Sequence, residues 1–409
     1  MRLFSDHYLA ALAPEERTWV TRVRDLCRNE IGPKAAEVAK VDQFAWGNFR
    51  LLADAGVIGT AFPRQYGGND ARLQLRIRLI EELGRVCSAS ASIVTGADLS
   101  ARAIVAGASE QLKQELVPRL CTGEIQAAFA LTEPGAGSDV RGIATTARRE
   151  GNGYVLNGRK KFITRASTAD WLVVIARLVE DSSPRRDGPM VALLVPSGAK
   201  GVAVGPEVDK LGWFGVPICE IALEDVQVPV ESRLGAEGEG FALAQDALVR
   251  ARIGHAAMAL GRAMGAIEIA ATYCNDRELS GAPLGAHQGV QWMLADMVTQ
   301  IEASRALLTN AAASYDRGDA DAPVQASMAK LHATDLGMRV VTDALQLTGG
   351  RGYLQSFPLE RFFRDAKLNQ IGEGSSEVHK TVIGRHVLKR ARSAERHPCL
   401  PEGRSTVSW

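Results

Sequence analysis

The sequence predicts an α+β protein in which an N-terminal helical domain and a C-terminal helical bundle flank a middle antiparallel β domain. Apolar residues recur at three-to-four spacing in the first 125 residues and again after residue 240. Short β-branched runs fill the region between, where seven of the sixteen prolines lie from Pro134 to Pro229. We therefore expect domains at 1–125, 126–235 and 236–390, and a tail at 391–409.

The N-terminal domain is expected to be helical because Leu12, Trp19 and Val23 share one helical face and 77–86 repeats the pattern. In the middle domain, Tyr154–Leu156 precedes Asn157-Gly158, a dipeptide typical of a two-residue hairpin turn. A hairpin is therefore predicted there. Further strands are predicted at 171–175, 191–195, 219–223 and 226–228.

The C-terminal domain is predicted to consist of long helices. No proline occurs between Pro229 and Pro283, and 241–274, 290–315 and 327–348 combine Ala, Leu and Met at helical spacing. Helices of this length usually pack as a bundle. Beyond residue 390 the chain is rich in Arg, Pro and Ser and is expected to be an extended tail.

Composition excludes several classes of function. The chain has 409 residues, 48 basic and 47 acidic, with a net charge of +1, so nucleic acid is not an expected partner. The six cysteines lack close pairs, so we expect reduced core thiols and no metal site. No apolar run reaches the about 20 residues that span a bilayer. Asp6, Glu15 and Glu16 are unlike a targeting segment, and a soluble cytoplasmic protein is expected.

Several common catalytic motifs are absent. Neither G-x-G-x-x-G after a strand nor G-x-x-x-x-G-K-[ST] occurs, so the usual NAD-Rossmann and P-loop phosphate cradles are missing. No G-x-S-x-G nucleophile elbow is present. His255 and His332 lie in helical stretches and are interpreted as satisfied helix residues rather than ligands.

Three segments remain as candidates for ligand binding. In 132–139 (TEPGAGSD), small residues allow close approach to the backbone, and hydroxyls suit a phosphate or a polar ring edge. Phe162 and Thr164, at i and i+2, share a strand face that could stack on a planar ligand. The third candidate is a helix that stops at Gly349-Gly350, followed by the loop 372–375 (GEGS). Taken singly, a surface turn, an amphipathic strand and a plain helix cap remain alternatives.

In this order and spacing, the segments resemble the acyl-CoA dehydrogenase family over about residues 10–390. The most specific matches are 132–139, 346–353 with 364–367, and 373–375. The resemblance implies an α domain, a β domain and a C-terminal four-helix bundle. It also implies FAD-dependent α,β-dehydrogenation of an acyl thioester, on CoA or on a carrier protein. Electrons would pass to an electron-transferring flavoprotein, as in fatty acid metabolism.

By resemblance, Glu373 is the base that removes the α-proton, because it occupies the Glu of the family motif Tyr-Glu-Gly-Thr. A free Glu, with a pKa of about 4.3, is too weak a base for a C–H bond, but apolar burial raises that pKa. Some relatives place the base just before a helix arginine, which here is Arg252; the preceding Ala251 cannot act as a base. Arg252 is expected near the carboxylate and the substrate, or alternatively in a bundle salt bridge. The backbone N–H of the base is implied to hold the thioester oxygen, with Gly374 beside it at the substrate.

The resemblance also implies contacts to FAD. Along one side of the isoalloxazine ring it places Phe129, Leu131 and Thr132, and on the other side Phe162 and Thr164. Ser138 is expected near the pyrophosphate or the substrate, and Ser375 and Glu377 near the flavin and the ADP moiety. Residues matching those that reach the FAD of a neighbouring subunit are Arg277, Gln346 and Gly350, so a homotetramer or homodimer is implied.

Three positions depart from the family pattern. Ser280 stands where the partner subunit usually supplies a phenylalanine to FAD. Gly372 replaces the bulky Tyr beside the base and is expected to open room near the α-carbon. Arg165 replaces a common Asn and is expected to place a positive charge near the flavin-binding strand, with a phosphate, a carboxylate or solvent as its partner.

Two alternatives stay open at the level of sequence. One is a flavin oxidase or monooxygenase on the same fold, although retention of Glu373 argues against the monooxygenases, which lack a base there. The other is a non-catalytic FAD-binding homologue.

Overall fold

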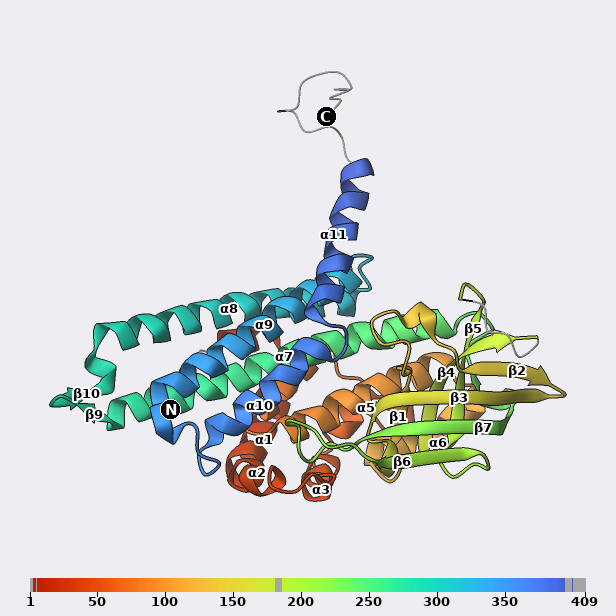
Figure 1. Cartoon of the computed structure of the whole chain (residues 1–409), viewed down its shortest axis with the longest axis horizontal. Helices are drawn as coiled ribbons and strands as arrows, with labels where there is room; N and C mark the ends of the chain where they lie inside the picture. Colours follow the sequence, from red (N-terminus) through yellow and green to blue (C-terminus); the bar gives the residue numbers. More distant parts are fainter. Residues whose placement is uncertain (1–2, 5, 181–185, 394–398, 400–409) are drawn as a thin grey trace.

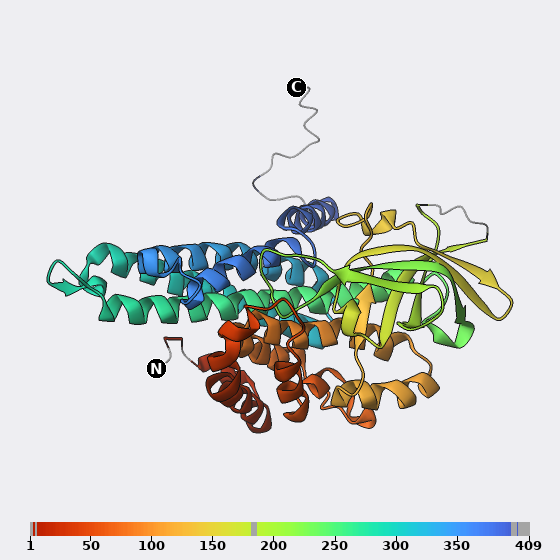
Figure 2. The same cartoon turned by 60° about the horizontal axis from the view of Figure 1, so that its bottom comes forward.

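Three groups of elements follow one another along the chain in the computed structural model, which describes residues 3–4, 6–180, 186–393 and 399 (Figure 1). The first group is helical and lies beneath the long bundle helices when the view is turned (Figure 2). Its helices are α1 (Pro14–Leu26), α2 (Gly32–Val38), α3 (Trp46–Asp54), α4 (Leu73–Gly84), α5 (Ser88–Gly107) and α6 (Glu110–Thr122). Local signals set some of their ends. The hydroxyl of Ser109 caps α6 by accepting from the Leu112 N–H at 3.3 Å, and Gly123 ends α6 with a φ of 72°.

The second group forms a sheet whose strand order is β6-β7-β3-β2-β4-β5-β8, and β1 pairs with β4 along the same edge as β2. The strands are β1 (Ala127–Ala130), β2 (Thr146–Glu150), β3 (Gly153–Thr164), β4 (Trp171–Val179), β5 (Met190–Pro196), β6 (Val202–Glu207), β7 (Ile218–Pro229) and β8 (Arg233–Leu234). Most neighbours are antiparallel, but β1 and β2 both run parallel to β4. The sheet is therefore mixed, and not purely antiparallel as predicted. The prediction differed because hydrophobic alternation indicates where strands lie but does not fix their direction.

The predicted hairpin turn at Asn157-Gly158 is wrong. β3 continues through both residues, and the turn lies earlier, at Gly151 and Asn152, between β2 and β3. The pairing of β3 with β7 shifts register between Leu156 and Gly158, as at a β-bulge. The side-chain amide of Asn157 donates to the carboxylate of Asp225 on β7 at 3.0 Å and accepts from the Asp225 N–H at 2.9 Å. Asn157-Gly158 thus serves a bulge within a long strand.

The third group is the bundle, whose helices are α7 (Gly240–Asp276), α8 (Gln288–Arg317), α9 (Ala322–Thr348), α10 (Pro358–Ile371) and α11 (Ser376–Ser393). A small hairpin of β9 (Glu278–Leu279) and β10 (Ala282–Pro283) joins α7 to α8. The helix α11 projects away from the body of the molecule (Figure 1). It extends past residue 390, where a tail was predicted, and apart from Cys399 the rest of that tail lies outside the described residues.

Glycines on α7 allow the N-terminal domain to approach the bundle closely. A Cβ at Gly261 would lie 2.2 Å from the carbonyl oxygen of Glu81, and one at Gly265 would lie 2.3 Å from that of Arg85. Only glycine fits at such helix contacts. The helix α4 is therefore pressed against the middle of α7.

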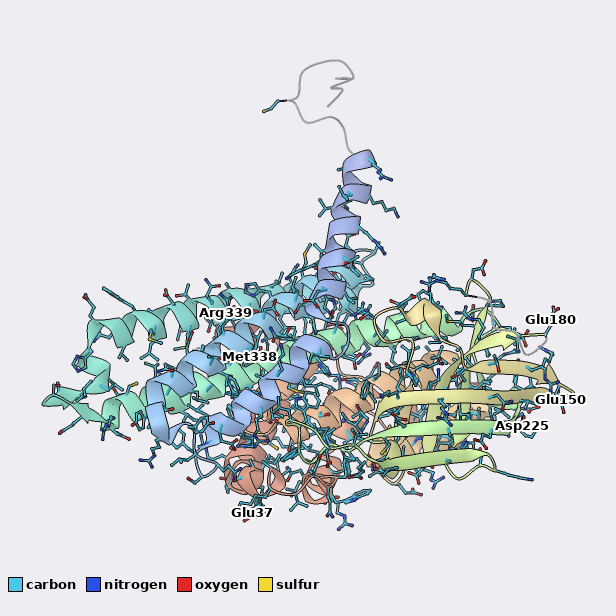
Figure 3. The ribbon with its side chains drawn as sticks, viewed as in Figure 1. Glu37, Glu150, Glu180, Asp225, Met338 and Arg339 are labelled. Carbon is cyan, nitrogen blue, oxygen red and sulfur yellow. The ribbon has the colours of Figure 1, made fainter. Side chains whose placement is uncertain are left out.

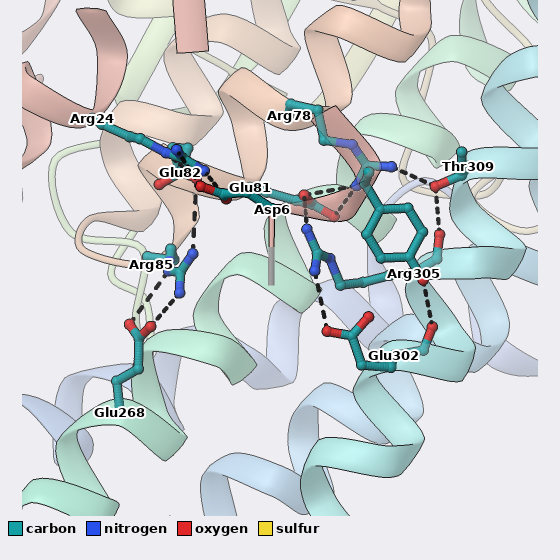
Figure 4. Close-up of polar contacts among 11 residues, drawn as sticks. Asp6, Arg24, Arg78, Glu81, Glu82, Arg85, Glu268, Glu302, Arg305 and Thr309 are labelled. Atoms are coloured by element: carbon teal, nitrogen blue, oxygen red, sulfur yellow. Dashed lines mark hydrogen bonds and ion pairs between the residues drawn. The ribbon is translucent and has the colours of Figure 1, made fainter. Parts of the chain in front are cut away.

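Buried ion pairs join the same two domains (Figure 4). On α4, Glu81 accepts from Arg78 at 2.8 Å and from Arg305 of α8 at 3.4 Å. Four residues further on, Arg85 pairs with Glu268 of α7. Breaking a buried ion pair leaves an unpaired charge in the interior of the protein, so these contacts favour one relative placement of the two domains.

Apolar packing divides into one large core shared by the N-terminal helices and the bundle, and a second core within the sheet. Cys27, Cys87, Cys121, Cys219 and Cys274 are buried, as expected of core residues. At the outer end of the sheet lie the acidic residues Glu150, Glu180 and Asp225, far from Met338 and Arg339 on α9 (Figure 3). In the described part of the chain, no helix is both long and apolar enough to cross a membrane.

Candidate active site

A cavity of about 640 Å³ lies where the sheet, α5, α7 and the end of α10 meet. Its wall includes residues from all three parts of the chain, so it exists only in the folded assembly of domains. From the sequence predictions it contains Thr132, Ser138, Phe162, Thr164, Glu373, Gly374 and Ser375.

Glu373 is in the short loop between α10 and α11, and the backbone conformation of that loop sets its orientation. Both Glu373 and Gly374 have left-handed backbones, with φ of 56° and 97°. A non-glycine residue in this region is uncommon and must be held there by its surroundings. The loop therefore stores strain at the position predicted to be catalytic.

The side chains of Lys330, Arg252 and His379 lie against this loop. Lys330 of α9 donates to the carbonyl oxygen of Gly374 at 2.6 Å, and Nε of Arg252 lies 3.4 Å from the carbonyl oxygen of Glu373. His379 of α11 is fully buried, and its Nε2 would be 3.1 Å from a Cβ at Gly374. Arg252 thus lies beside Glu373 and contacts its backbone carbonyl oxygen.

The electrostatics of the loop favour a carboxylate that binds its proton more tightly than usual. Burial raises the pKa of Glu373 above its ordinary value, and the charges of Arg252 and Lys330 partly oppose that rise. Burial in turn lowers the pKa of Lys330 to about 8. A group with this raised pKa, in a cavity wall, is suited to general-base chemistry.

The segment that begins at Thr132 also lines the cavity and is fixed to β3. The carbonyl oxygen of Thr132 accepts from the Lys161 N–H at 2.8 Å. Beneath it, the ammonium of Lys160 contacts the carboxylate of Glu133 at 2.6 Å and the carbonyl oxygen of Leu131 at 3.2 Å. This buried ion pair keeps the Thr132 hydroxyl at the cavity wall.

Phe162 is the exposed aromatic side chain of this wall. It is 56% exposed, has a φ of 57°, and lies where the pairing of β3 with β7 shifts register for a second time. Thr164, two residues on, also lines the cavity. The structure therefore brings together an apolar ring, the hydroxyls of Thr132, Thr164 and Ser138, and the carboxylate of Glu373.

Three of the predicted flavin-contacting residues do not line this cavity. Phe129 packs against the large core, Leu131 is buried, and Glu377 lies exposed at the start of α11. Their side chains are therefore not part of the wall. Phe129 lies on β1 and Leu131 directly follows it, and both contribute to the large core.

Arg277, Gln346 and Gly350 are grouped at a second depression, which we call the bundle-end groove. It has a volume of about 1270 Å³, and these three residues line it together with Leu279 and Arg351. The groove shares no lining residue with the cavity that contains Glu373. Ser280 and Gly281, with φ of 52° and 84°, form the turn of the β9–β10 hairpin beside it.

Arg165 does not project toward the cavity as a free charge. It is 4% exposed with a φ of 63°, and its Nη2 would be 2.6 Å from a Cβ at Gly96 of α5. Its Nε has no hydrogen-bond partner within the described chain, and burial lowers its pKa to about 10. No described carboxylate forms an ion pair with this guanidinium, so the expected carboxylate partner is not seen among these residues.

Sequence reasoning missed Lys330, His379 and Trp213 as parts of the site. A signal for Lys330 was available, because Ala326, Lys330, Ala333 and Gly337 follow helical spacing on the buried stripe of α9. A lysine on such a stripe is unusual and calls for a buried acceptor. Trp213, at the cavity wall, carries no comparable signal in the sequence.

Comparison with known sequences identifies all three parts of the chain. Profiles described as the N-terminal, middle and C-terminal domains of acyl-CoA dehydrogenases match residues 13–124, 128–226 and 238–388. Acryloyl-CoA reductase (NADH) of Anaerotignum propionicum is 38% identical over 382 residues, covering 93% of this chain and 96% of that protein. The short-chain specific acyl-CoA dehydrogenase of Clostridium acetobutylicum is 39% identical over 368 residues, covering 90% and 96%.

Solved structures give the same result. Butyryl-CoA dehydrogenase from Megasphaera elsdenii has a TM-score of 0.87 at 34% identity and covers 92% of this chain and 99% of its own. An acyl-CoA dehydrogenase complexed with FAD from Bacillus anthracis has a TM-score of 0.87 at 26% identity, with 96% and 71% covered. A chain from a structure described as an electron-transferring flavoprotein of Acidaminococcus fermentans has a TM-score of 0.88 at 35% identity, with 92% and 99% covered.

Proposed function

The chain belongs to the acyl-CoA dehydrogenase family, and on this premise we propose that it dehydrogenates an acyl-CoA thioester with Glu373 as base and FAD as cofactor. The observation that carries the assignment of the base is a half-buried carboxylate of raised pKa in the wall of the cavity that Phe162 and Thr164 also line. Bound FAD would supply the acceptor for the hydride that leaves the β-carbon.

The residues present fit a flavin. An apolar ring left 56% exposed at Phe162 offers a surface for a planar group, and the hydroxyls of Thr132 and Thr164 offer partners for its polar edge. Ser138 and Ser375 extend the hydroxyl lining at either end. We propose that these residues hold the isoalloxazine, with Leu131 taking part through its backbone at most.

Glu373 is proposed to take the α-proton of the substrate. Burial supports this role because it raises the pKa of the carboxylate and strengthens it as a base. Arg252 and Lys330 limit the rise and hold the loop by its carbonyl oxygens. The backbone at Glu373 and Gly374 is then fixed, so that an N–H there is available to the thioester oxygen.

Arg277, Gln346 and Gly350 are proposed to bind the adenosine end of FAD in a neighbouring subunit. Support comes from their position in the bundle-end groove, which is separate from the cavity of the same chain. A homotetramer or homodimer would follow, with each flavin site completed by a partner. The exposed Leu279 and Ser280 would stand at that edge in place of an aromatic side chain.

Electrons are proposed to leave through an electron-transferring flavoprotein, and fatty acid metabolism in the cytoplasm is the proposed setting. An acyl thioester on a carrier protein, in place of CoA, is the alternative substrate. The reaction is reversible in principle, and one relative is named as a reductase.

Anaerobic flavin bleaching tests this function. Purified protein with bound FAD is mixed with straight and branched acyl-CoAs and with acyl-carrier substrates, and the loss of oxidised flavin absorbance is followed. We expect bleaching by at least one acyl-CoA and slow reoxidation by air. Rapid reoxidation would indicate an oxidase, and a flavin that no acyl thioester bleaches would indicate a non-catalytic homologue.

A further inference from the structure

His255 of α7 is a polar side chain in the wall of the cavity beside the predicted base. It is 8% exposed and lines the cavity together with Ala251, one helical turn earlier on the same helix. Its sequence context suggested a satisfied helix residue. Only one of its ring nitrogens, Nδ1, has a hydrogen-bond partner among the described residues.

A chain of hydrogen bonds fixes the tautomer of His255. Arg262 donates to Oδ1 of Asn369 at 2.7 Å, and because a guanidinium has only donors, the amide cannot be flipped there. The NH₂ group of Asn369 therefore faces Nδ1 of His255, at 3.2 Å. Arg262 is itself anchored on the hydroxyl of Ser88, at 3.0 Å. Nδ1 must accept, so the proton of the neutral ring is on Nε2.

The ring remains neutral at ordinary pH. Burial, together with the charges of Lys330 and Arg262, lowers the pKa of His255 to about 3. No described carboxylate forms an ion pair with it. The neutral ring therefore offers one hydrogen-bond donor, the Nε2–H, in a fixed orientation, and it does not take up a second proton.

Two neighbours determine how that donor is presented. The indole of Trp213 stacks on the ring, with centroids 5.6 Å apart and planes 29° apart, so one face of the imidazole is covered. The edge at Cε1 faces Gly372, where a Cβ would be 3.6 Å away. Because residue 372 has no side chain, the ring edge next to Nε2 stays open to the cavity. No described residue accepts a hydrogen bond from Nε2.

We propose that His255 selects acyl groups that carry an oxygen acceptor, which receives the Nε2–H within the acyl-binding part of the cavity. This inference rests on the proposed function and names its substrate class: an acyl thioester with a carbonyl, ether or hydroxyl oxygen, rather than a plain alkyl chain. A plain chain would displace water from Nε2 and leave a buried donor unpaired, which is unfavourable. Sites built to bond a substrate group reject analogues that lack it.

Matched substrates test the proposal. In a series of acyl-CoAs, one methylene at a time beyond the β-carbon is replaced by an ether oxygen, and each member is compared with its all-carbon counterpart. We expect one position of the oxygen to raise kcat/KM about tenfold. In His255→Leu that preference should vanish, while turnover of the all-carbon chain is kept or increased. His332→Leu, a half-buried histidine of α9 outside the cavity, is the matched control and should keep the preference.

A binding measurement keeps the test independent of turnover. Dissociation constants of the same pairs are measured through the change in flavin absorbance with the corresponding enoyl-CoA products. Gly372→Leu supplies a second variant, which covers the ring edge while residue 255 remains histidine, and it should also abolish the preference.

The outcomes distinguish a failure of the proposed role of His255 from a failure of the proposed dehydrogenase function. The role of His255 is overturned if acyl-CoAs bleach the flavin but both members of every pair have equal kcat/KM, in the wild type and in His255→Leu. The proposed dehydrogenase function would then still stand. Absence of bleaching by any thioester refutes the dehydrogenase. The binding ratios of wild type and His255→Leu then still decide whether His255 recognises oxygen.

Discussion

The ammonium group of Lys330 donates a 2.6 Å hydrogen bond to the carbonyl oxygen of Gly374, the residue directly after Glu373. This bond joins the middle of α9 to a loop whose backbone is left-handed at two successive residues. It also places a buried positive charge close enough to Glu373 to lower the pKa of that carboxyl. Lys330 is therefore a positioning residue with an electrostatic effect on the proposed base.

Glu373→Gln is expected to retain FAD and to lose flavin bleaching by about 10³-fold, since removal of a general base typically costs 10²–10⁴. The amide keeps the size of the side chain but cannot take a proton. Stopped-flow absorbance under anaerobic conditions measures the effect. Glu115→Gln, an exposed glutamate of α6, is the matched control and should bleach like wild type. Normal bleaching by Glu373→Gln would remove it from the mechanism.

Lys330→Met is expected to move the acidic limb of the pH profile of kcat/KM to higher pH. The reason is that the charge of Lys330 lowers the pKa of Glu373, so its loss lets burial raise that pKa further. Lys330→Gln removes the charge but keeps a donor for Gly374, so it should show the same shift with a smaller loss of kcat. An acidic limb that stays in place in both variants would contradict electrostatic coupling between the two residues.

His379→Gln is expected to make the protein less sensitive to acid. Burial and the charges of Lys330 and Arg252 lower the pKa of His379 to about 3, whereas in the unfolded chain it is about 6.5. Between these values the unfolded state binds the extra proton, so stability falls as the pH falls, by up to about 1.4 kcal/mol per pH unit. Urea unfolding from pH 7.5 to 5 should show a shallower loss in the variant.

His287→Gln, at an exposed position directly before α8, serves as the control for that experiment and should retain the wild-type slope. Equal slopes in His379→Gln and wild type would mean that His379 is protonated in the folded protein.

Arg165→Met is expected to stabilise the protein by about 1–3 kcal/mol, because it removes a buried charge that no described carboxylate pairs with. Arg177→Met provides the comparison. Arg177 is also buried, but it donates to the carbonyl oxygen of Arg141 at 2.6 Å, so its replacement should destabilise. Chemical denaturation measures both. A loss of stability in Arg165→Met would reveal an anion bound at Arg165 in solution.

Part of the candidate site was predicted from short segments of the sequence. Gly374 has a φ of 97°, a backbone conformation that favours glycine, and the structure places Thr132, Ser138 and Gly374 in one cavity wall. The side chains of Phe129 and Leu131 lie outside the cavity wall, and a matching position in the sequence does not tell which way a side chain points.

Periodicity and proline placement by themselves determined the order of helices, sheet and bundle, because these patterns reflect local geometry and burial. Only the tertiary structure decided the direction of β1 and β2, the bulge at Asn157-Gly158 and the surroundings of the base. Lys330, His379 and His255 come from different helices, and their protonation depends on how completely neighbouring elements exclude water. That exclusion is a property of packing between distant segments, which no window along the chain contains.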